Sequence, residues 1–212
     1  MTPALTMLWP TIVSGVDLKA PDGVNAALVE AARKVVADTR INGLDYHFVS
    51  NTLDHLPLLK ATGNGNAIDW WLSNVEQLVR STIRDAFHSD PSCTLELVGH
   101  CMIAKSGDRI PAHRHASHDF TVVYYPHVDA PIREDRLNDG ALCLIDERSW
   151  RYMFRNRNHR FRDGSAFRIH PHTSLMACFP GYVLHDTNVY PGPGFRVTLT
   201  AQVKLVMERE YA

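Results

Sequence analysis

The second half of the chain is a series of short apolar runs, from about residue 94 to residue 207, separated by turns rich in glycine and proline. The runs include 94–98, 120–125, 141–145, 175–179 and 196–207, with turns at Asp139-Gly140 and at residues 191–194. Many short strands at regular spacing are typical of a double-sheet jelly roll or a small barrel. This pattern therefore predicts a β-rich core.

The first ninety residues predict helices. Apolar residues recur at helical spacing over 24–38 and over 67–87, where the stripe comprises Ile68, Leu72, Val75, Val79 and Ile83. Trp70 and Trp71 are expected to pack this second helix against the sheet. Residues 7–16 predict a short strand, whereas 39–66 predict a loop with one short strand near 46–49.

We therefore predict a mainly β fold with flanking helices (α+β) and a single domain over 1–212. Within it, 1–90 would be a helical support region and 94–207 the core. At 212 residues the chain is long enough to bury such a core without disulfides.

Composition limits the classes of partner and the compartment. The formal net charge of −1 predicts neither a nucleic-acid nor an anionic-membrane partner. The four cysteines form no Cys-x-x-Cys pair and fit buried thiols in a reducing compartment. We see no signal peptide and no run of eighteen apolar residues, so a soluble cytoplasmic protein is expected.

A histidine pair precedes the strand predicted at 120–125. In an extended segment His113 and His115 would project to one face, roughly 6–7 Å apart along the chain. Such a pair can bind one metal ion, and His185 is the third candidate ligand. Iron(II) sites with open positions typically use two histidines and one carboxylate. Two ligand sets therefore stay open, namely three histidines, or a set that includes Asp119.

An arginine on the last predicted strand suggests a site for an anion. Arg196 alternates with apolar neighbours and shares a face with Thr198 and Thr200, a polar face suited to a barrel interior. A guanidinium binds a carboxylate through two parallel hydrogen bonds. Tyr124 and Tyr125 point to opposite faces of their strand, so one can assist Arg196 while the other packs in the core.

The segment 148–162 interleaves six arginines with four aromatic residues. Basic and aromatic residues together can bind single-stranded nucleic acid. The neutral net charge favours a substrate lid or a solvated loop instead.

Taken together, these motifs resemble the 2-oxoglutarate/iron(II) oxygenases related to the prolyl hydroxylases. The matching stretches are residues 107–108 with 111–117, 122–125, 140–144, 179–186 and 196–199, with further likeness at Leu8-Trp9-Pro10-Thr11 and Asn25. The resemblance implies a double-stranded β-helix (jelly roll, cupin-like) with N-terminal helices packed on one sheet.

The resemblance also implies a reaction and its cofactors. Fe(II) would be held by the histidine pair and His185, and the distal carboxylate of 2-oxoglutarate would meet Arg196 with help from Tyr125. With O₂, decarboxylation to succinate and CO₂ would drive hydroxylation of a C–H bond. His115 departs from the usual pattern, because it stands where the family has a carboxylate ligand.

Two alternatives remain. A cupin-like three-histidine metalloenzyme would not use 2-oxoglutarate, and Arg196 would then have no co-substrate role. A non-catalytic binding domain would lose nothing when His113 or His185 is changed. The substrate is expected to be an unidentified small molecule or peptide, and the apolar helix stripes allow for a homodimer.

Overall fold

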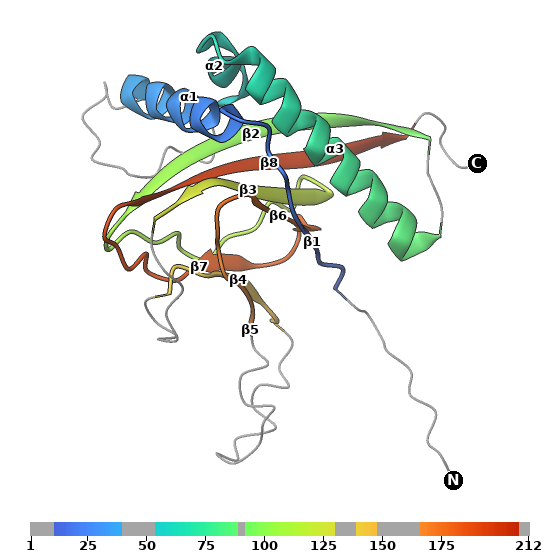
Figure 1. Ribbon diagram of the computed structural model, residues 1–212. Coiled ribbons are helices and arrows are strands. Elements are labelled where there is room, and N and C mark those ends of the chain that lie inside the picture. The colour runs from blue at the N-terminus through green and yellow to red at the C-terminus, as the bar shows by residue number, and fades with distance from the viewer. Residues whose placement is uncertain (1–10, 40–53, 89–91, 130–138, 148–165, 208–212) are drawn as a thin grey trace, which may run out of the picture.

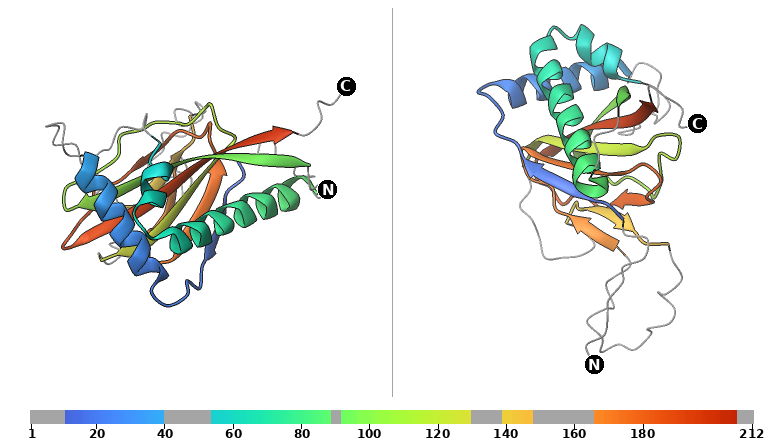
Figure 2. Two further views of the ribbon diagram at one scale, coloured as in Figure 1. Left: turned by 90° about the horizontal axis from the view of Figure 1, so that it is seen from above. Right: turned by 90° about the vertical axis from the view of Figure 1, so that its right-hand side faces the viewer.

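The computed structural model describes residues 11–39, 54–88, 92–129, 139–147 and 166–207. Its strands form two antiparallel sheets, and its helices lie together on the outer side of the larger sheet (Figure 1). Views from two further directions show the same three layers of helices, larger sheet and smaller sheet (Figure 2).

The larger sheet has five strands. In spatial order these are β1 (Ser14–Asp17), β6 (Leu175–Pro180), β3 (Phe120–Val128), β8 (Phe195–Met207) and β2 (Cys93–Lys105). The smaller sheet has the order β5 (Ala166–Ile169), β4 (Leu142–Ile145) and β7 (His185–Thr187). After β3 the chain crosses to the smaller sheet for β4 and β5, returns to the larger sheet for β6, crosses again for β7 and returns for β8, which brings distant segments together.

Three helices cover the larger sheet, namely α1 (Val24–Thr39), α2 (Leu56–Ala61) and α3 (Gly65–Phe87) (Figure 1). The predicted stripe of α3 faces inward, because Ile68, Val75, Val79 and Ile83 are all buried. The ring of Trp70 meets that of Tyr124 edge to face at 5.9 Å, and Trp71 is fully buried. The expected packing of the tryptophan pair against the sheet is confirmed.

The strand β8, which lies between β3 and β2, divides its residues between two buried environments. Val197, Leu199, Ala201 and Val203 join the core under the helices. The alternate residues, beginning with Arg196 and Thr198, line a cavity between the two sheets. This alternation follows from the two-residue repeat of a strand, and the polar interior face predicted from the sequence is present.

The predicted fold class is confirmed, with three differences in the elements. Residues 94–104 form one continuous strand, β2, rather than two. The strand predicted at 7–16 is described as β1 at Ser14–Asp17, while residues 1–10 lie outside the described residues, as does the strand predicted at 46–49. The region predicted as loop contains α2.

The single-domain assignment over 1–212 stays a prediction. Within the described residues no helix is long and apolar enough to span a membrane.

Candidate metal centre

Three histidines from segments far apart in the sequence meet between the sheets. His113 and His185 form an isolated antiparallel bridge, in which each backbone N–H donates to the other residue's carbonyl oxygen at 2.9 Å. The N–H of His115 donates to the carbonyl oxygen of Gly181 at 2.8 Å. The pair is therefore fastened to the segment that leads from β6 into β7, which begins at His185.

The three side chains converge on one point. One ring nitrogen of each histidine lies within 4.8 Å of those of the other two. The ring centroids are 4.3 Å apart for His113 and His185, 4.9 Å for His113 and His115, and 5.2 Å for His115 and His185. The three histidines expected from the sequence thus lie together in the described part of the chain. The histidine pair is not in a regular strand, because only His113 forms a bridge.

The glycine at position 181 permits this close approach. A Cβ built on Gly181 would lie only 2.7 Å from the carbonyl oxygen of His115 and closer still to that of His118. Any side chain here would push the loop that carries His115 away from β6. The small residue is therefore part of what places the third imidazole.

Two of the imidazoles are fixed by backbone carbonyl groups. Nδ1 of His113 lies 2.9 Å from the oxygen of Pro111, and Nδ1 of His185 lies 2.8 Å from the oxygen of Val183. A carbonyl oxygen only accepts hydrogen bonds, so each Nδ1 carries a proton and each Nε2 keeps its lone pair. This is the tautomer in which a metal-binding histidine is usually held.

His115 is fixed by a side chain instead. The amide nitrogen of Gln202, a buried residue on β8, lies 2.8 Å from Nδ1 of His115. The two ends of a glutamine amide are assigned from their hydrogen bonds. The same amide nitrogen lies 3.5 Å from Nε2 of His115. Gln202 therefore holds the ring of His115 from β8.

Burial keeps His115 and His185 uncharged. It lowers the pKa of His115 to about 3, and the neighbouring His185 and His113 add to the effect. It also lowers the pKa of His185 to about 4, with His113 contributing in the same direction. Both rings are therefore neutral near pH 7, which is the form that donates a lone pair to a cation.

A cavity of about 70 Å³ connects the histidines with Arg196. Its polar lining comprises His100, His113, His115, Thr121, Tyr125, His185, Thr187, Arg196, Thr198, Thr200 and Gln202. Val123 and Leu142 supply apolar walls. One end therefore offers lone pairs to a metal, and the other end offers a cation.

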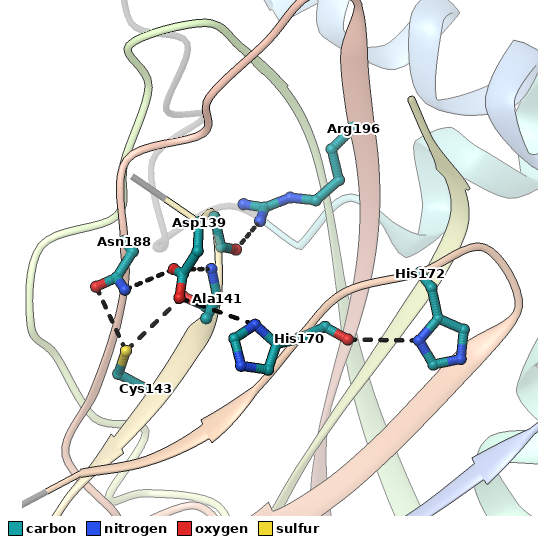
Figure 3. Close-up of polar contacts among 8 residues, drawn as sticks. Asp139, Ala141, Cys143, His170, His172, Asn188 and Arg196 are labelled. Carbon is teal, nitrogen blue, oxygen red and sulfur yellow. Dashed lines mark hydrogen bonds and ion pairs between the residues drawn. The ribbon is translucent and has the colours of Figure 1, made fainter. Parts of the chain in front are cut away.

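Arg196 is 1% exposed, and Nη1 of its guanidinium donates to the carbonyl oxygen of Gly140 at 2.5 Å (Figure 3). Its Cζ lies 5.8 Å from the ring centre of Tyr125 and 5.6 Å from that of Tyr190. Burial lowers the pKa of Arg196 below its ordinary value, and the two tyrosines oppose that change. Within the described part of the chain, no carboxylate lies within 4.0 Å of its side-chain nitrogens.

Several buried polar atoms in the cavity lack a partner among the described residues. They are Nε of Arg196 and the hydroxyl oxygens of Thr121 and Thr198. A buried polar group without a hydrogen bond is costly, so such a group often marks the place of a ligand. Nε of Arg196 and the hydroxyl group of Thr198, two residues along β8, fit the oxygen atoms of an anion beside the guanidinium. Thr121 instead pairs with Gln202, which contacts His115, so its hydroxyl group lies at the metal end.

The two tyrosines divide as the sequence suggested. Tyr125 lies between the sheets beside Arg196, and burial raises its pKa while Arg196 opposes the rise. Tyr124 faces the helices, and its hydroxyl group donates to Oδ1 of Asn25 at 2.6 Å. Tyr125 is thus the tyrosine near the anion end.

The other sequence candidates lie elsewhere. Asp119 is exposed, and its Oδ2 accepts a hydrogen bond from the N–H of Leu205 at 2.7 Å, away from the three converging ring nitrogens. The arginine-rich segment 148–162 lies outside the described residues.

The sequence analysis missed Gln202, although Gln202 follows Arg196, Thr198 and Thr200 in the same alternation along β8. It also missed Thr121, which no pattern singles out.

Comparison with known proteins decides the fold. No model of a protein family matches the chain, and no curated protein matches it. A prolyl-4-hydroxylase from Pseudomonas putida superposes with a TM-score of 0.55 at 16% identity, covering 94% of this chain and 89% of that one. The chain has the fold of the 2-oxoglutarate/iron(II) oxygenases. The family fold expected from the sequence motifs is therefore confirmed.

Two further structures with this fold carry ligands. A prolyl hydroxylase from Trichoplax adhaerens, in complex with a peptide of a hypoxia inducible factor, has a TM-score of 0.52 at 15% identity and covers 91% of this chain and 83% of its own. The epimerase SnoN, in complex with Fe³⁺, alpha-ketoglutarate and nogalamycin RO, has a TM-score of 0.53 at 12% identity, with 93% and 79% covered.

Proposed function

We propose that this chain is an iron(II)- and 2-oxoglutarate-dependent dioxygenase that hydroxylates its substrate while 2-oxoglutarate is converted to succinate and CO₂. His113, His115 and His185 bind the metal, and Arg196 and Tyr125 bind the co-substrate. The observation that carries the proposal is the single cavity that joins three converging imidazoles to a buried guanidinium.

The donor set fits the metal. Imidazole suits divalent iron, and three side chains leave coordination positions open for co-substrate and O₂. Nδ1 of both His113 and His185 is held by a carbonyl oxygen, which directs Nε2 toward the metal position. The fold agrees, because SnoN is described with iron and alpha-ketoglutarate bound.

The buried cation fits the co-substrate. 2-Oxoglutarate is a 2-oxo acid with a second carboxylate at its far end. Its oxo-acid end suits a metal, and the far carboxylate suits Arg196 together with the unpaired hydroxyl group of Thr198. An incoming carboxylate would pair directly with a guanidinium that Asp108 influences only through its charge and that no described carboxylate contacts.

When bound, the iron, O₂ and 2-oxoglutarate supply the oxidising chemistry. The protein holds His115 and His185 neutral, aims the three imidazoles at one point, and fixes the far end of the co-substrate through Arg196. Val123 and Leu142 line the walls and limit the access of water. Tyr125 keeps its proton because burial raises its pKa, so its hydroxyl group can donate to a carboxylate.

The substrate class remains a small molecule or a peptide. Both occur among proteins of this fold, since the Trichoplax enzyme is described with a peptide and SnoN with nogalamycin RO.

One observation favours the second candidate, a three-histidine metalloenzyme that does not use 2-oxoglutarate. His115 leaves the metal with three neutral protein ligands, as the cupin-like alternative requires. The buried Arg196, however, has a clear role only when an anion enters the cavity. We therefore place the 2-oxoglutarate-dependent reaction first.

An anaerobic titration tests the proposal. Iron(II) is added to the purified protein, 2-oxoglutarate follows, and the visible absorption spectrum is recorded. A metal-to-ligand charge-transfer band that requires both components is expected. Iron binding without the band would support the alternative that does not use 2-oxoglutarate, and absence of iron binding would support a non-catalytic domain.

Two variants assign the residues. His185→Ala is expected to abolish stoichiometric iron binding, and retained iron would contradict its role as a ligand. Arg196→Ala is expected to leave iron in place and to weaken 2-oxoglutarate binding roughly 10- to 100-fold, as for the loss of a charge-assisted hydrogen-bonded pair. Unchanged affinity for 2-oxoglutarate would contradict the anchor.

A further inference from the structure

The guanidinium of Arg196 is held from behind by a backbone carbonyl group rather than by a carboxylate. Nη1 donates to the oxygen of Gly140, while Nε lies in the cavity without a partner. The carbonyl oxygen neutralises no charge, so it orients the guanidinium and leaves its positive charge available to a ligand. The direction of this carbonyl group therefore decides where the cation points.

A tight turn sets that direction. Gly140 has φ +65°, a left-handed conformation that glycine adopts without strain. A Cβ at this position would lie 3.3 Å from the ring of Tyr190 and 3.5 Å from Nη1 of Arg196. The backbone thus approaches the guanidinium closely, and a small rotation of this peptide group would move the anchor.

The side chain of Asp139 closes the turn. Its Oδ1 accepts hydrogen bonds from the N–H of Ala141 at 2.9 Å and from Nδ2 of Asn188 at 2.6 Å (Figure 3). The side chain of Asp139 is 2% exposed, and its Oδ2 lies 3.8 Å from Nδ1 of His170. A carboxylate this deeply buried is costly unless it is hydrogen-bonded and paired, and these contacts provide both.

The same contacts join the turn to the strand of a metal ligand. Asn188 comes three residues after His185, and its backbone N–H donates to the oxygen of Ala141 at 2.8 Å. The N–H of Gly140 donates to the oxygen of Val189 at 3.1 Å. The turn is therefore fastened to the segment that carries His185 at its other end, so it links the two ends of the cavity.

We infer that Asp139 is a positioning residue for the co-substrate: through Gly140 it fixes Arg196 at the distance from the metal that a five-carbon 2-oxo diacid spans. This inference rests on the proposed function and adds a specificity-determining element to it. Asp139 itself contacts neither the metal nor the co-substrate. Its effect is therefore confined to ligands whose second carboxylate reaches Arg196.

Two ligands separate the ends of the site. 2-Oxoglutarate reaches Arg196, whereas pyruvate has the same 2-oxo acid end and no distal carboxylate. Dissociation constants of both are measured under argon on the iron(II)-loaded protein, together with the dissociation constant of iron. Asp139→Ala is expected to raise the dissociation constant of 2-oxoglutarate about tenfold and to leave the dissociation constants of pyruvate and iron unchanged.

Further variants distinguish geometry from charge. Asp139→Asn keeps an oxygen acceptor for Ala141 and Asn188 and is expected to retain at least half of the wild-type affinity for 2-oxoglutarate. Asn188→Ala removes one of the two hydrogen bonds to Oδ1 of Asp139. It is expected to weaken the binding of 2-oxoglutarate alone, by a smaller factor than Asp139→Ala does. It also provides the test should Asp139→Ala fail to fold. Asp85→Ala, which removes an exposed carboxylate on α3, is the matched control.

The outcomes are separable. If Asp139→Ala and Asn188→Ala both bind 2-oxoglutarate as tightly as the wild type, the inference is overturned and the proposed function stays intact. A variant that loses affinity for 2-oxoglutarate, pyruvate and iron by the same factor would also overturn it, because this result would show a general structural role of Asp139. A wild-type protein that binds iron without binding 2-oxoglutarate would overturn the proposed function itself, and the inference with it.

Discussion

The residue that most distinguishes this site is His115. A carboxylate at this position would cancel one of the two positive charges of iron(II), whereas an imidazole cancels none. The centre proposed here therefore keeps a higher charge and attracts the anionic co-substrate more strongly. The lowered pKa of His115 agrees with this arrangement, because a neutral ring has a lone pair to donate to a cation.

Gln202 is expected to control how well His115 binds the metal. Gln202→Leu keeps a side chain of similar size but removes the amide that contacts the ring of His115. Loss of such an outer contact typically costs 10- to 100-fold in metal affinity. We predict a loss of at least about tenfold, measured by competition with a coloured chelator.

Gln77→Leu provides the control for this experiment. Gln77 is exposed on α3, so the same chemical change occurs far from the triad. Equal iron affinity of Gln202→Leu and the wild type would show that His115 needs no partner, or that it is not a ligand.

At the scale of elements, the segment that enters α2 shows what the sequence could not predict. Oδ1 of Asp54 accepts hydrogen bonds from the N–H groups of Leu56 and Gly99, both at 2.9 Å. His55 is fully buried against β2, where its Nδ1 accepts from the N–H of Cys101 at 3.2 Å. A helix of six residues gives too little periodicity to detect, and its stability comes from these tertiary contacts.

The buried His55 is expected to make the metal-free protein sensitive to acid. Burial lowers its pKa to about 4, with His100 adding to the effect and Asp54 opposing it. In the unfolded chain its pKa returns to about 6.5. The unfolded state therefore binds more protons between these values, so this contribution to stability is complete above pH 6.5 and is lost as the pH falls toward 4.

We predict that His55→Asn reduces this pH dependence. Asparagine retains an acceptor near the position of Nδ1 and does not titrate. Denaturant unfolding of metal-free wild type and variant between pH 7 and pH 4.5 measures the difference, which is on the order of 2 to 3 kcal/mol over the full titration. His115 and His185 contribute in the same direction in both proteins, so the comparison isolates His55. Parallel curves would show that His55 stays neutral in both states or is not buried.

At the scale of the whole molecule, much of the arrangement was predictable. The alternation along β8 predicted that Arg196, Thr198 and Thr200 face an interior, and the helical stripe of α3 predicted its buried face. The convergence of His113, His115 and His185 followed only once the motifs resembled a known family, because spacing alone does not place residues seventy positions apart. The sequence predicted the turn at Asp139-Gly140 but not its contact with Arg196, because that contact joins residues more than fifty positions apart.

The measurement that tests the central claim most directly is a crystal structure of the protein with manganese(II) and 2-oxoglutarate, recorded at the absorption edge of the metal. We predict one anomalous peak per chain, bound by His113, His115 and His185, with the distal carboxylate of 2-oxoglutarate on Arg196. A metal bound elsewhere, a carboxylate such as Asp119 in place of His115, or a co-substrate directed away from Arg196 would contradict the account.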